Sequence, residues 1–283
     1  MKRIIGLLLC CLLLTSCCAL AEEAIYELPL DIDFPNYAAN PDGYTETTYQ
    51  DDSLSVRLTS DKYRGAPYYV AYFEVKSPTQ LRTATAGRPN ENVVALPSQI
   101  GKAKKAVLTL NGEYYVQRSR DIFIWRQGKE FRNQADPFKD VLIIDDAGDF
   151  HIFTSKDKAQ EIQAFQDAGG KIVNAFSFGP GLVIDGQKAK LRKDYYFSPE
   201  ELTGRSAVAQ FGPLSYAFIY CPAATQEDMS NIALSLNALQ AYNMDGGNSS
   251  VLLFHNEYVG GKKKNTEREQ SDILYVVSAV APN

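Results

Sequence analysis

The sequence has few of the residues that usually carry metal or nucleophilic chemistry, with only two histidines among 283 residues. His151 and His255 cannot form a three-histidine zinc site, and no H-E-x-x-H motif occurs. The sequence also lacks a G-x-S-x-G motif, a Walker A loop and a G-x-G-x-x-G fingerprint. Carboxylates, arginines and backbone amides remain for chemistry, and we expect neither a cofactor nor a metal ion.

Cysteine is scarce outside the first residues of the chain. Four of the five cysteines belong to the N-terminal leader: Cys10, Cys11, Cys17 and Cys18. Because only Cys221 remains in the rest of the chain, a disulfide framework is excluded.

Long apolar runs are confined to the N-terminus. Met1–Arg3 is basic and Ile4–Leu14 is apolar, which is too short to cross a bilayer of about 30 Å. We therefore predict a signal peptide over residues 1–21 and a secreted or extracytoplasmic protein. Two processing sites remain open, a lipobox-like Leu14–Cys17 that would leave a lipid anchor at the cell surface, and the ordinary site Ala19–Ala21.

Positive charge is in the minority. Once Lys2 and Arg3 are removed with the leader, 27 basic residues face 34 acidic ones. An acidic protein does not attract polyanions, so we expect no nucleic-acid partner and no membrane contact except through an N-terminal lipid anchor.

The pattern after the leader predicts an α+β fold. Residues 22–52 read as an irregular lead-in rich in Pro, Asn, Asp and Tyr, and residues 53–283 as a single domain. That domain is expected to have a mixed, mostly antiparallel β-sheet core and a few packed helices. The predicted strands are short and apolar or β-branched: Ser53–Thr59, Pro67–Lys76, Ala106–Leu110, Ile122–Trp125, Val141–Ile144, Phe150–Phe153, Val251–Phe254 and Ile273–Val277.

Two segments have helical periodicity. The first runs from Ala159 to Ala168 and ends at two glycines. In the second, Thr225 is the expected N-cap, acidic residues occupy the first turn, and an apolar stripe extends to Leu239.

Two glycine-containing segments are candidate sites. Asp245–Ser250 has two glycines that can point backbone N–H groups at an oxyanion, although a tight turn explains the same spacing. Asn111–Tyr115 follows an apolar strand, so Glu113 is expected at a strand end, as a working carboxylate or as a solvated turn residue.

Several segments, taken in order, resemble the bacterial phosphodiester glycosidase family, which includes relatives of N-acetylglucosamine-1-phosphodiester α-N-acetylglucosaminidase. The resemblance covers roughly Val56 to Val277. The segments that carry it are Leu81–Ala84, Leu110–Tyr115, Ala175–Pro180, Leu182–Gly186, Gly204–Ala207, Met244–Ser250, and Arg268 followed by Ser271–Tyr275. The chain departs from the family motifs at Glu113, Gly204 and Asn248.

The resemblance implies an exported hydrolase that cleaves the glycosidic bond of a sugar-1-phosphodiester in envelope or extracellular glycans, including exopolysaccharide. Free sugar and a phosphomonoester would be released. Asp245 is the expected catalytic carboxylate, with Glu113 as its partner. The expected substrate- and phosphate-binding residues are Arg82, Asn111, Arg205, Gly246, Gly247, Ser249, Ser250 and Arg268.

Two other functions remain open. A non-catalytic glycan-binding protein on the same scaffold would keep the aromatic residues and have no need of Asp245. A phosphodiesterase that cuts the P–O bond would usually need paired metals held by histidine and aspartate.

Overall fold

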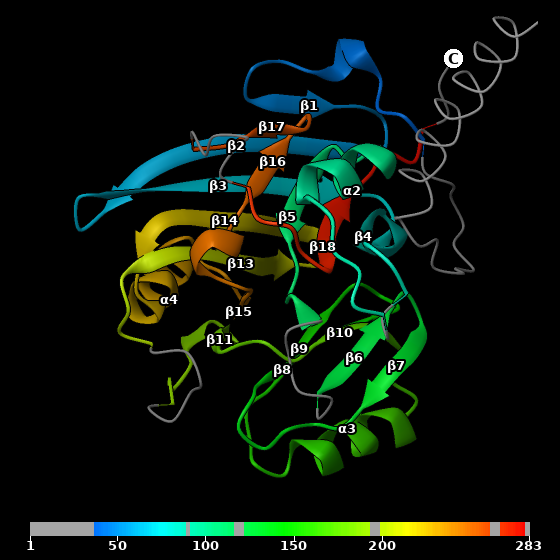
Figure 1. Ribbon diagram of the computed structural model, residues 1–283, viewed down its shortest axis with the longest axis vertical. Helices are drawn as coiled ribbons and strands as arrows, with labels where there is room; N and C mark the ends of the chain where they lie inside the picture. The colour runs from blue at the N-terminus through cyan, green and yellow to red at the C-terminus, as the bar shows by residue number, and fades with distance from the viewer. Residues whose placement is uncertain (1–36, 89–90, 116–121, 193–198, 261–266, 281–283) are drawn as a thin grey trace, which may run out of the picture.

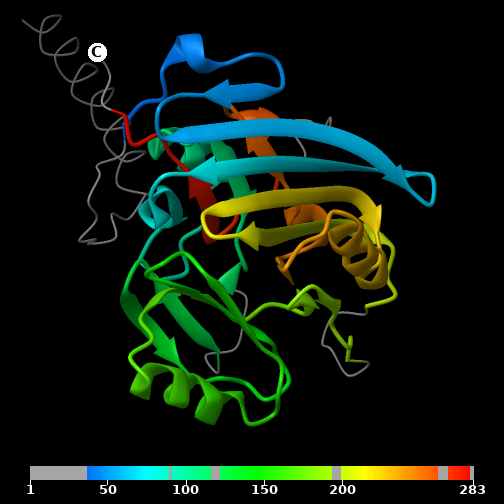
Figure 2. The same ribbon diagram turned by 180° about the vertical axis from the view of Figure 1, so that it is seen from behind.

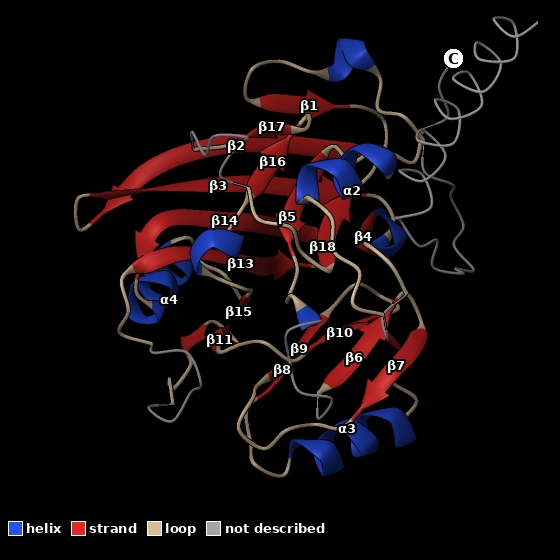
Figure 3. Cartoon of the chain, in the orientation of Figure 1, coloured by secondary structure: helices blue, strands red, loops and turns tan. Residues whose placement is uncertain are grey.

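The computed structural model describes residues 37–88, 91–115, 122–192, 199–260 and 267–280. Strands dominate it, and the helices lie at the periphery (Figure 3). The described strands form three sheets, and all of their pairings are antiparallel. This agrees with the α+β class, but the prediction of one mixed sheet is wrong, because a short apolar run predicts a strand without predicting its neighbours.

The largest sheet has eight strands and lies in the upper half of Figure 1, where two long hairpins make up its centre. In spatial order, its strands are β1 (Thr48–Gln50), β2 (Leu54–Tyr63), β3 (Ala66–Val75), β14 (Ser215–Ala224), β13 (Thr203–Gly212), β15 (Gln240–Asn243), β11 (Gly181–Ile184) and β12 (Gln187–Lys188). The β13–β14 hairpin was not among the predicted strands. Both of its faces are buried along most of its length, so it lacks the polar alternation that marks a half-exposed strand.

The other two sheets have five strands each. The lower sheet in Figure 1 consists of β7 (Lys129–Asn133), β6 (Phe123–Arg126), β10 (Ile172–Phe176), β8 (Val141–Asp145) and β9 (Phe150–Phe153). The third sheet consists of β17 (Glu257–Tyr258), β16 (Leu252–Phe254), β5 (Leu108–Asn111), β18 (Asp272–Val276) and β4 (Leu81–Thr85). Helix α2 (Pro97–Ala103) packs on this third sheet, in contact with β5 and β18.

Both predicted helices are present. Helix α3 (Lys158–Asp167) is followed by Gly169 in a left-handed conformation. Helix α4 (Gln226–Ser235) begins with the predicted Thr225 cap, in a reciprocal capping box with Asp228. The prediction that the apolar stripe of this helix reaches Leu239 is wrong. The helix ends at Ser235, and Leu239 is 46% exposed.

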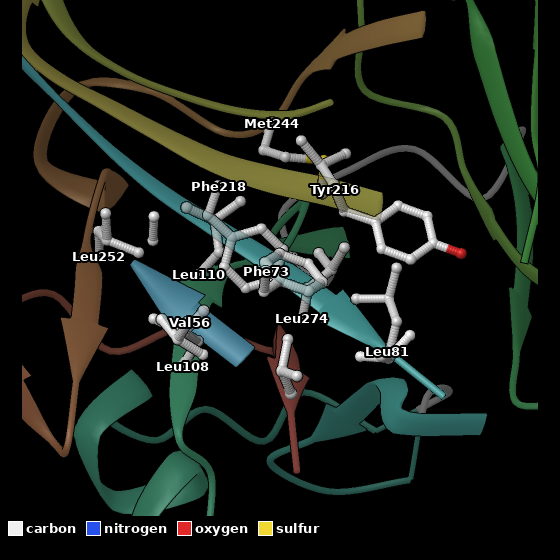
Figure 4. Packing of buried hydrophobic residues seen from close by; sticks show 14 of the residues in the cluster. Val56, Phe73, Leu81, Leu108, Leu110, Tyr216, Phe218, Met244, Leu252 and Leu274 are labelled. Atoms are coloured by element: carbon white, nitrogen blue, oxygen red, sulfur yellow. The ribbon is translucent and has the colours of Figure 1, made fainter. Parts of the chain in front are cut away.

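One hydrophobic cluster connects the three sheets. Phe73 and Phe218 of the eight-stranded sheet pack edge to face in it, with ring centroids 5.0 Å apart. Figure 4 shows these rings between Leu110 and Leu274 of the third sheet, and Leu142 of the lower sheet belongs to the same cluster. Burying each such side chain contributes roughly 1.5–3 kcal/mol. This shared core fixes the sheets against one another and therefore positions the loops at their ends.

The segment expected as an irregular lead-in is partly ordered against this core. Its described part, from residue 37 onward, contains a short 3-10 helix (Pro41–Gly43) and strand β1. Strand β1 pairs with β2 and forms one edge of the eight-stranded sheet, as Figure 2 shows from the opposite side of the molecule. Tyr37 also forms a bridge with Ser278 near the other end of the chain. The predicted signal peptide lies outside the described residues. Among the described residues, no helix is long and apolar enough to cross a bilayer.

Candidate active site

Asn111, at the end of β5, attaches the aspartate–diglycine segment to the third sheet. Its side-chain Nδ2 donates to the backbone carbonyl of Asp245 at 2.8 Å, and its Oδ1 accepts from the backbone N–H of Val251 at 3.1 Å. The N–H of Asp245 donates to the carbonyl of Gly112 at 3.2 Å. The structure therefore brings two predicted site segments together, although they are more than 130 residues apart in the sequence.

Arg205 lies beside Asp245 because of the sheet register. Ala207 on β13 pairs with Asn243 on β15, and continuing that antiparallel register by two residues sets Arg205 opposite Asp245. The Arg205 Nε donates to the carbonyl of Ala224 at 3.2 Å, and its Nη2 donates to the carbonyl of Glu201 at 2.9 Å. Burial lowers the pKa of Arg205, while Glu201 and Asp245 oppose that shift. The guanidinium is thus held in place and its charge is directed toward Asp245.

The two glycines after Asp245 fit a crowded turn. Gly247 has φ of 62°, a left-handed conformation that favours glycine. A methyl group on Gly246 would lie 3.4 Å from Nη1 of Arg205, and one on Gly204 would lie 2.7 Å from the carbonyl oxygen of Gly247. The backbone of this turn therefore approaches Arg205 closely, and Gly204 permits that approach.

The serines of the same segment are buried within the turn. The Ser250 hydroxyl lies 3.5 Å from the carbonyl of Asp245, and the Ser249 carbonyl accepts from Nε2 of Gln270 at 2.6 Å. Among the residues that the structure describes, the Ser249 hydroxyl has no hydrogen-bond partner. A buried hydroxyl in this position can accept or donate one hydrogen bond to a ligand.

Comparison with known proteins assigns the chain to a family. The model of the phosphodiester glycosidase family matches residues 104–277, which is more than half of the chain. The chain belongs to the phosphodiester glycosidase family. The matched region contains the Asn111–Glu113 turn, Arg205 and the Asp245–Ser250 segment. No curated protein sequence matches the chain.

Solved structures share the fold of this family member. The catalytic domain of zebrafish N-acetylglucosamine-1-phosphodiester α-N-acetylglucosaminidase, auto-inhibited by its pro-peptide, superposes with a TM-score of 0.64 at 16% identity. That alignment covers 86% of this chain and 87% of the zebrafish chain. A hypothetical protein from Synechocystis superposes with a TM-score of 0.65 at 12% identity, over 83% of this chain and 64% of that one. At these identities, the likeness shows a shared fold.

Glu113 occupies a second group of charges, which we call the buried ion cluster and which consists of Glu113, Arg126 and Asp272. Nη2 of Arg126 donates to Oε1 of Glu113 at 2.6 Å and to Oδ2 of Asp272 at 2.8 Å. The other Glu113 oxygen accepts from the backbone N–H of Ser177 at 2.7 Å. All three side chains are at most 1% exposed. Both Glu113 oxygens are therefore engaged inside the protein.

Burial and neighbouring charges shift the pKa values of Glu113 and Arg126. Burial raises the pKa of Glu113, and Arg126 opposes this shift while Asp272 adds to it. Burial also works against the charge of Arg126, but Glu113 and Asp272 outweigh it and raise the pKa of the guanidinium. Arg126 therefore stays charged, and it is the group that makes two adjacent buried carboxylates tolerable.

Asp272 shapes the turn that leads from Asn111 into the cluster. Its carboxylate accepts from the backbone N–H groups of Glu113 and Tyr114 at 3.4 and 3.1 Å. A methyl group on Gly112 would lie 2.3 Å from the Asp272 carboxylate, so only glycine fits there. Tyr114 has φ of 53°, and Arg268 stacks on its ring at 4.5 Å. The guanidinium of Arg268, a predicted site residue, therefore contacts the turn that contains Glu113.

Arg82 is not brought to the Asp245–Arg205 pair. It pairs with Tyr275 on β18, which in turn pairs with Thr109 on β5. This register places Arg82 two strands across and two residues back from Asn111, a separation of about 12 Å. Its guanidinium instead donates to the carbonyl of Thr79. Arg82 thus lies on a strand of the third sheet, while Arg205 lies on β13 of the eight-stranded sheet.

Sequence reasoning gave no role to Arg126 or Asp272. A charged residue at the end of an apolar strand, as in Phe123–Arg126, was the only signal for the first. Among the described residues, no group of three or more His, Cys, Asp or Glu side chains could hold a metal ion. The groups that the structure brings together at the Asp245 turn are a carboxylate, a guanidinium and backbone amides.

Proposed function

We propose that this family member is an exported hydrolase that cleaves the glycosidic bond of a sugar-1-phosphodiester in envelope or extracellular glycans. The products are free sugar and a phosphomonoester. The observation that carries this proposal is the placement of Arg205 opposite Asp245, beside the turn formed by Gly246 and Gly247. A cation for the phosphate and a carboxylate for the anomeric centre are the two groups that this reaction needs.

Arg205 binds the phosphate in this proposal. Two of its nitrogens are held by the carbonyls of Ala224 and Glu201, while Nη1 lies toward Gly246. A guanidinium positioned in this way offers directional charged hydrogen bonds to phosphate oxygens. The backbone of Gly246 and Gly247 and the hydroxyls of Ser249 and Ser250 line the same anion-binding turn, as members of the phosphate site.

Asp245 supplies the catalytic carboxylate. The phosphate is already a good leaving group, so cleavage depends on stabilising positive charge at the anomeric carbon. Asp245 keeps 7% of its surface exposed, and its Oδ1 accepts from the N–H of Gly246 at 2.9 Å. A retained anomeric configuration in the released sugar identifies direct attack by Asp245, and an inverted configuration identifies activation of water.

Glu113 has a positioning role in this proposal. Both of its oxygens accept hydrogen bonds within the buried ion cluster and from Ser177. It therefore holds the turn after Asn111 against the loop that follows β10, and we do not assign it a catalytic step. Asn111 likewise acts by fixing the backbone of Asp245. Arg268, stacked on Tyr114, contributes positive charge on the same turn.

The test is hydrolysis of a methyl phosphodiester of N-acetylglucosamine 1-phosphate, the sugar phosphate that the zebrafish enzyme is named for. We expect release of reducing sugar, and a loss of about 10³-fold in Asp245→Asn. Asp185→Asn is the matched control, because Asp185 is an exposed aspartate in the turn between β11 and β12. Binding without release would favour a glycan-binding protein. Label from ¹⁸O water in the phosphate would instead indicate a phosphodiesterase.

Export is also part of the proposal. The predicted leader over residues 1–21 and its two alternative processing sites support it. Mass spectrometry of the mature protein from its producing cell distinguishes a lipid-modified Cys17 from an N-terminus at Glu22. An unprocessed Met1 would contradict export.

A further inference from the structure

A small pocket lies on the same face of the eight-stranded sheet as Arg205. It has a volume of about 120 Å³ and is formed by the tip of the β2–β3 hairpin, the end of β14 and helix α4. Its lining is largely apolar and includes Pro67, Leu202, Cys221, Ala223 and Ile232. Leu202 is 67% exposed, the highest value among the exposed large hydrophobic residues of the described chain.

The sheet register places this pocket next to the guanidinium. Arg205 on β13 is the direct partner of Cys221 on β14, which lines the pocket. Directly paired residues have their Cβ atoms about 5 Å apart and point to the same face. Asp245 lies on the other side of Arg205. Apolar pocket, guanidinium and carboxylate therefore form a row across β14, β13 and the segment that directly follows β15.

The same backbone also connects the two features. Ala224 lines the pocket, and its carbonyl accepts from Arg205 Nε. Leu202 lines the pocket, while the next residues, Thr203 and Gly204, lie against Gly247 and Gly246. The pocket and the phosphate site thus share one wall, formed by residues 202–205.

We propose that this pocket binds the alcohol portion of the substrate, and that this portion is an apolar group of about four carbon atoms esterified to the phosphate. The inference rests on the proposed function, because it takes Arg205 as the phosphate-binding residue. The order along the substrate is sugar, phosphate, alcohol. The order across the strands is Asp245, Arg205, pocket.

The size and polarity of the pocket support this choice of ligand. A cavity of about 150 Å³ holds a benzene ring, so a pocket of 120 Å³ has room for about four carbons. The one carboxylate in the lining, Asp228, accepts a hydrogen bond from the Thr225 hydroxyl and forms an ion pair with Arg64. Burial, with a contribution from Asp228, raises the pKa of the Cys221 thiol to about 12, so it stays neutral. Tyr63 and Arg64 also line the pocket, and the Arg64 side chain is 73% exposed and paired with Asp228. The other lining residues are apolar and favour an alkyl group.

The test measures binding of methyl phosphate and n-butyl phosphate by calorimetry with the full mature chain. These are the phosphomonoester products, so the measurement does not depend on the identity of the sugar. Each buried methylene corresponds to about a four-fold gain in affinity, and we expect n-butyl phosphate to bind at least about 10-fold more tightly than methyl phosphate. Equal affinities would overturn the proposal.

Two variants locate the site. Ala223→Leu fills the pocket, and Leu202→Asp places a charge in its wall. Each should reduce the preference for butyl over methyl to less than about two-fold. Ala223→Leu should also bind methyl phosphate as before, because Ala223 lies outside the wall that the pocket shares with the phosphate site. Leu239→Asp is the control, because Leu239 is an exposed leucine outside the pocket. A butyl preference that survives in both pocket variants, or that falls equally in the control, would contradict this site.

Hydrolysis separates this inference from the proposed function. Methyl and n-butyl diesters of the same sugar phosphate have leaving groups of nearly equal reactivity, so a higher kcat/KM for the butyl diester reports pocket binding. Cleavage of both diesters at the same rate would reject the pocket and keep the hydrolase. Tight binding of butyl phosphate without cleavage of either diester would reject the hydrolase and keep the pocket.

Discussion

Two charged groups flank the turn from Asn111 to Glu113, and they differ in what surrounds their carboxylates. In the buried ion cluster, Arg126 bridges Glu113 and Asp272, and Ser177 occupies the remaining Glu113 oxygen. In the other group, Asp245 faces Arg205 beside a glycine turn and keeps some exposure. The difference teaches that strong burial of a charge marks the scaffold here, while the less enclosed carboxylate is the candidate for chemistry.

Removing Arg126 should cause the largest loss in the stability of the folded protein. Arg126→Met leaves Glu113 and Asp272 adjacent and without their counter-charge, and we expect a loss of roughly 3–5 kcal/mol in the free energy of unfolding. Urea denaturation measures this loss. Arg57→Met is the matched control, because Arg57 is exposed. If both variants unfold at the same urea concentration, the cluster is not a determinant of stability.

A third carboxylate extends the comparison to pH. Asp140 accepts from the N–H of Gly181 at 2.9 Å, and burial raises its pKa to about 6, against that hydrogen bond. Because the folded state binds the proton more tightly than the unfolded state does, the protein should gain up to about 3 kcal/mol as the pH falls from above 6 to 4. Asp140→Asn should lose this gain.

Thermal unfolding of the wild type and of Asp140→Asn between pH 4 and 8 checks this prediction. The difference in stability between the two proteins should change as the pH rises from 4 to about 7 and stay constant above that range. Parallel curves across the whole range would show that Asp140 does not titrate near pH 6.

Arg205→Lys should affect activity more than stability. Lysine keeps the charge and loses the fixed, branched geometry, so we expect a loss of about 100-fold in kcat/KM. The urea midpoint should move much less than in Arg126→Met. Hydrolysis of the methyl phosphodiester together with urea denaturation checks both parts. The reverse result, with activity kept and stability lost, would exchange the roles assigned to the two arginines.

Gly112→Ala should disturb both the buried ion cluster and the Asp245 turn, with a smaller loss of stability than Arg126→Met causes. A methyl group there would lie 2.3 Å from the Asp272 carboxylate, while the backbone carbonyl of Gly112 binds Asp245. We expect a loss of about 2 kcal/mol in stability, accompanied by reduced activity. Gly212→Ala is the control, because no atom lies within 4 Å of a methyl group placed there. Unchanged stability in Gly112→Ala would show that the turn can relax around the methyl group.

Sequence reasoning identified the parts of the site that carry local signals. The glycines after Asp245, the strand before Asn111 and the Thr225 cap each have a pattern within a few residues, and their structures agree with it. The proximity of Arg205 to Asp245 depends on the register of two strands, which sequence spacing does not encode.

The remaining differences between the sequence-based predictions and the structure also have physical causes. Arg126 and Asp272 are charged residues in strands, and they contact each other across 146 residues of sequence. Arg82 is separated from the site by strand order, which no local pattern reveals. The β13–β14 hairpin is buried on both faces and therefore shows no alternation.

The row of Asp245, Arg205 and Cys221 has a consequence for how substrate preference can change over evolution. Cys221 and Arg205 belong to neighbouring strands, Asp245 follows the end of the next strand, β15, and neighbouring strands lie about 4.8 Å apart whatever their side chains are. Substitutions on β14 could therefore alter the accepted alcohol while the spacing between carboxylate and guanidinium stays constant. Selection on new aglycones would then proceed without rebuilding the bond-breaking machinery.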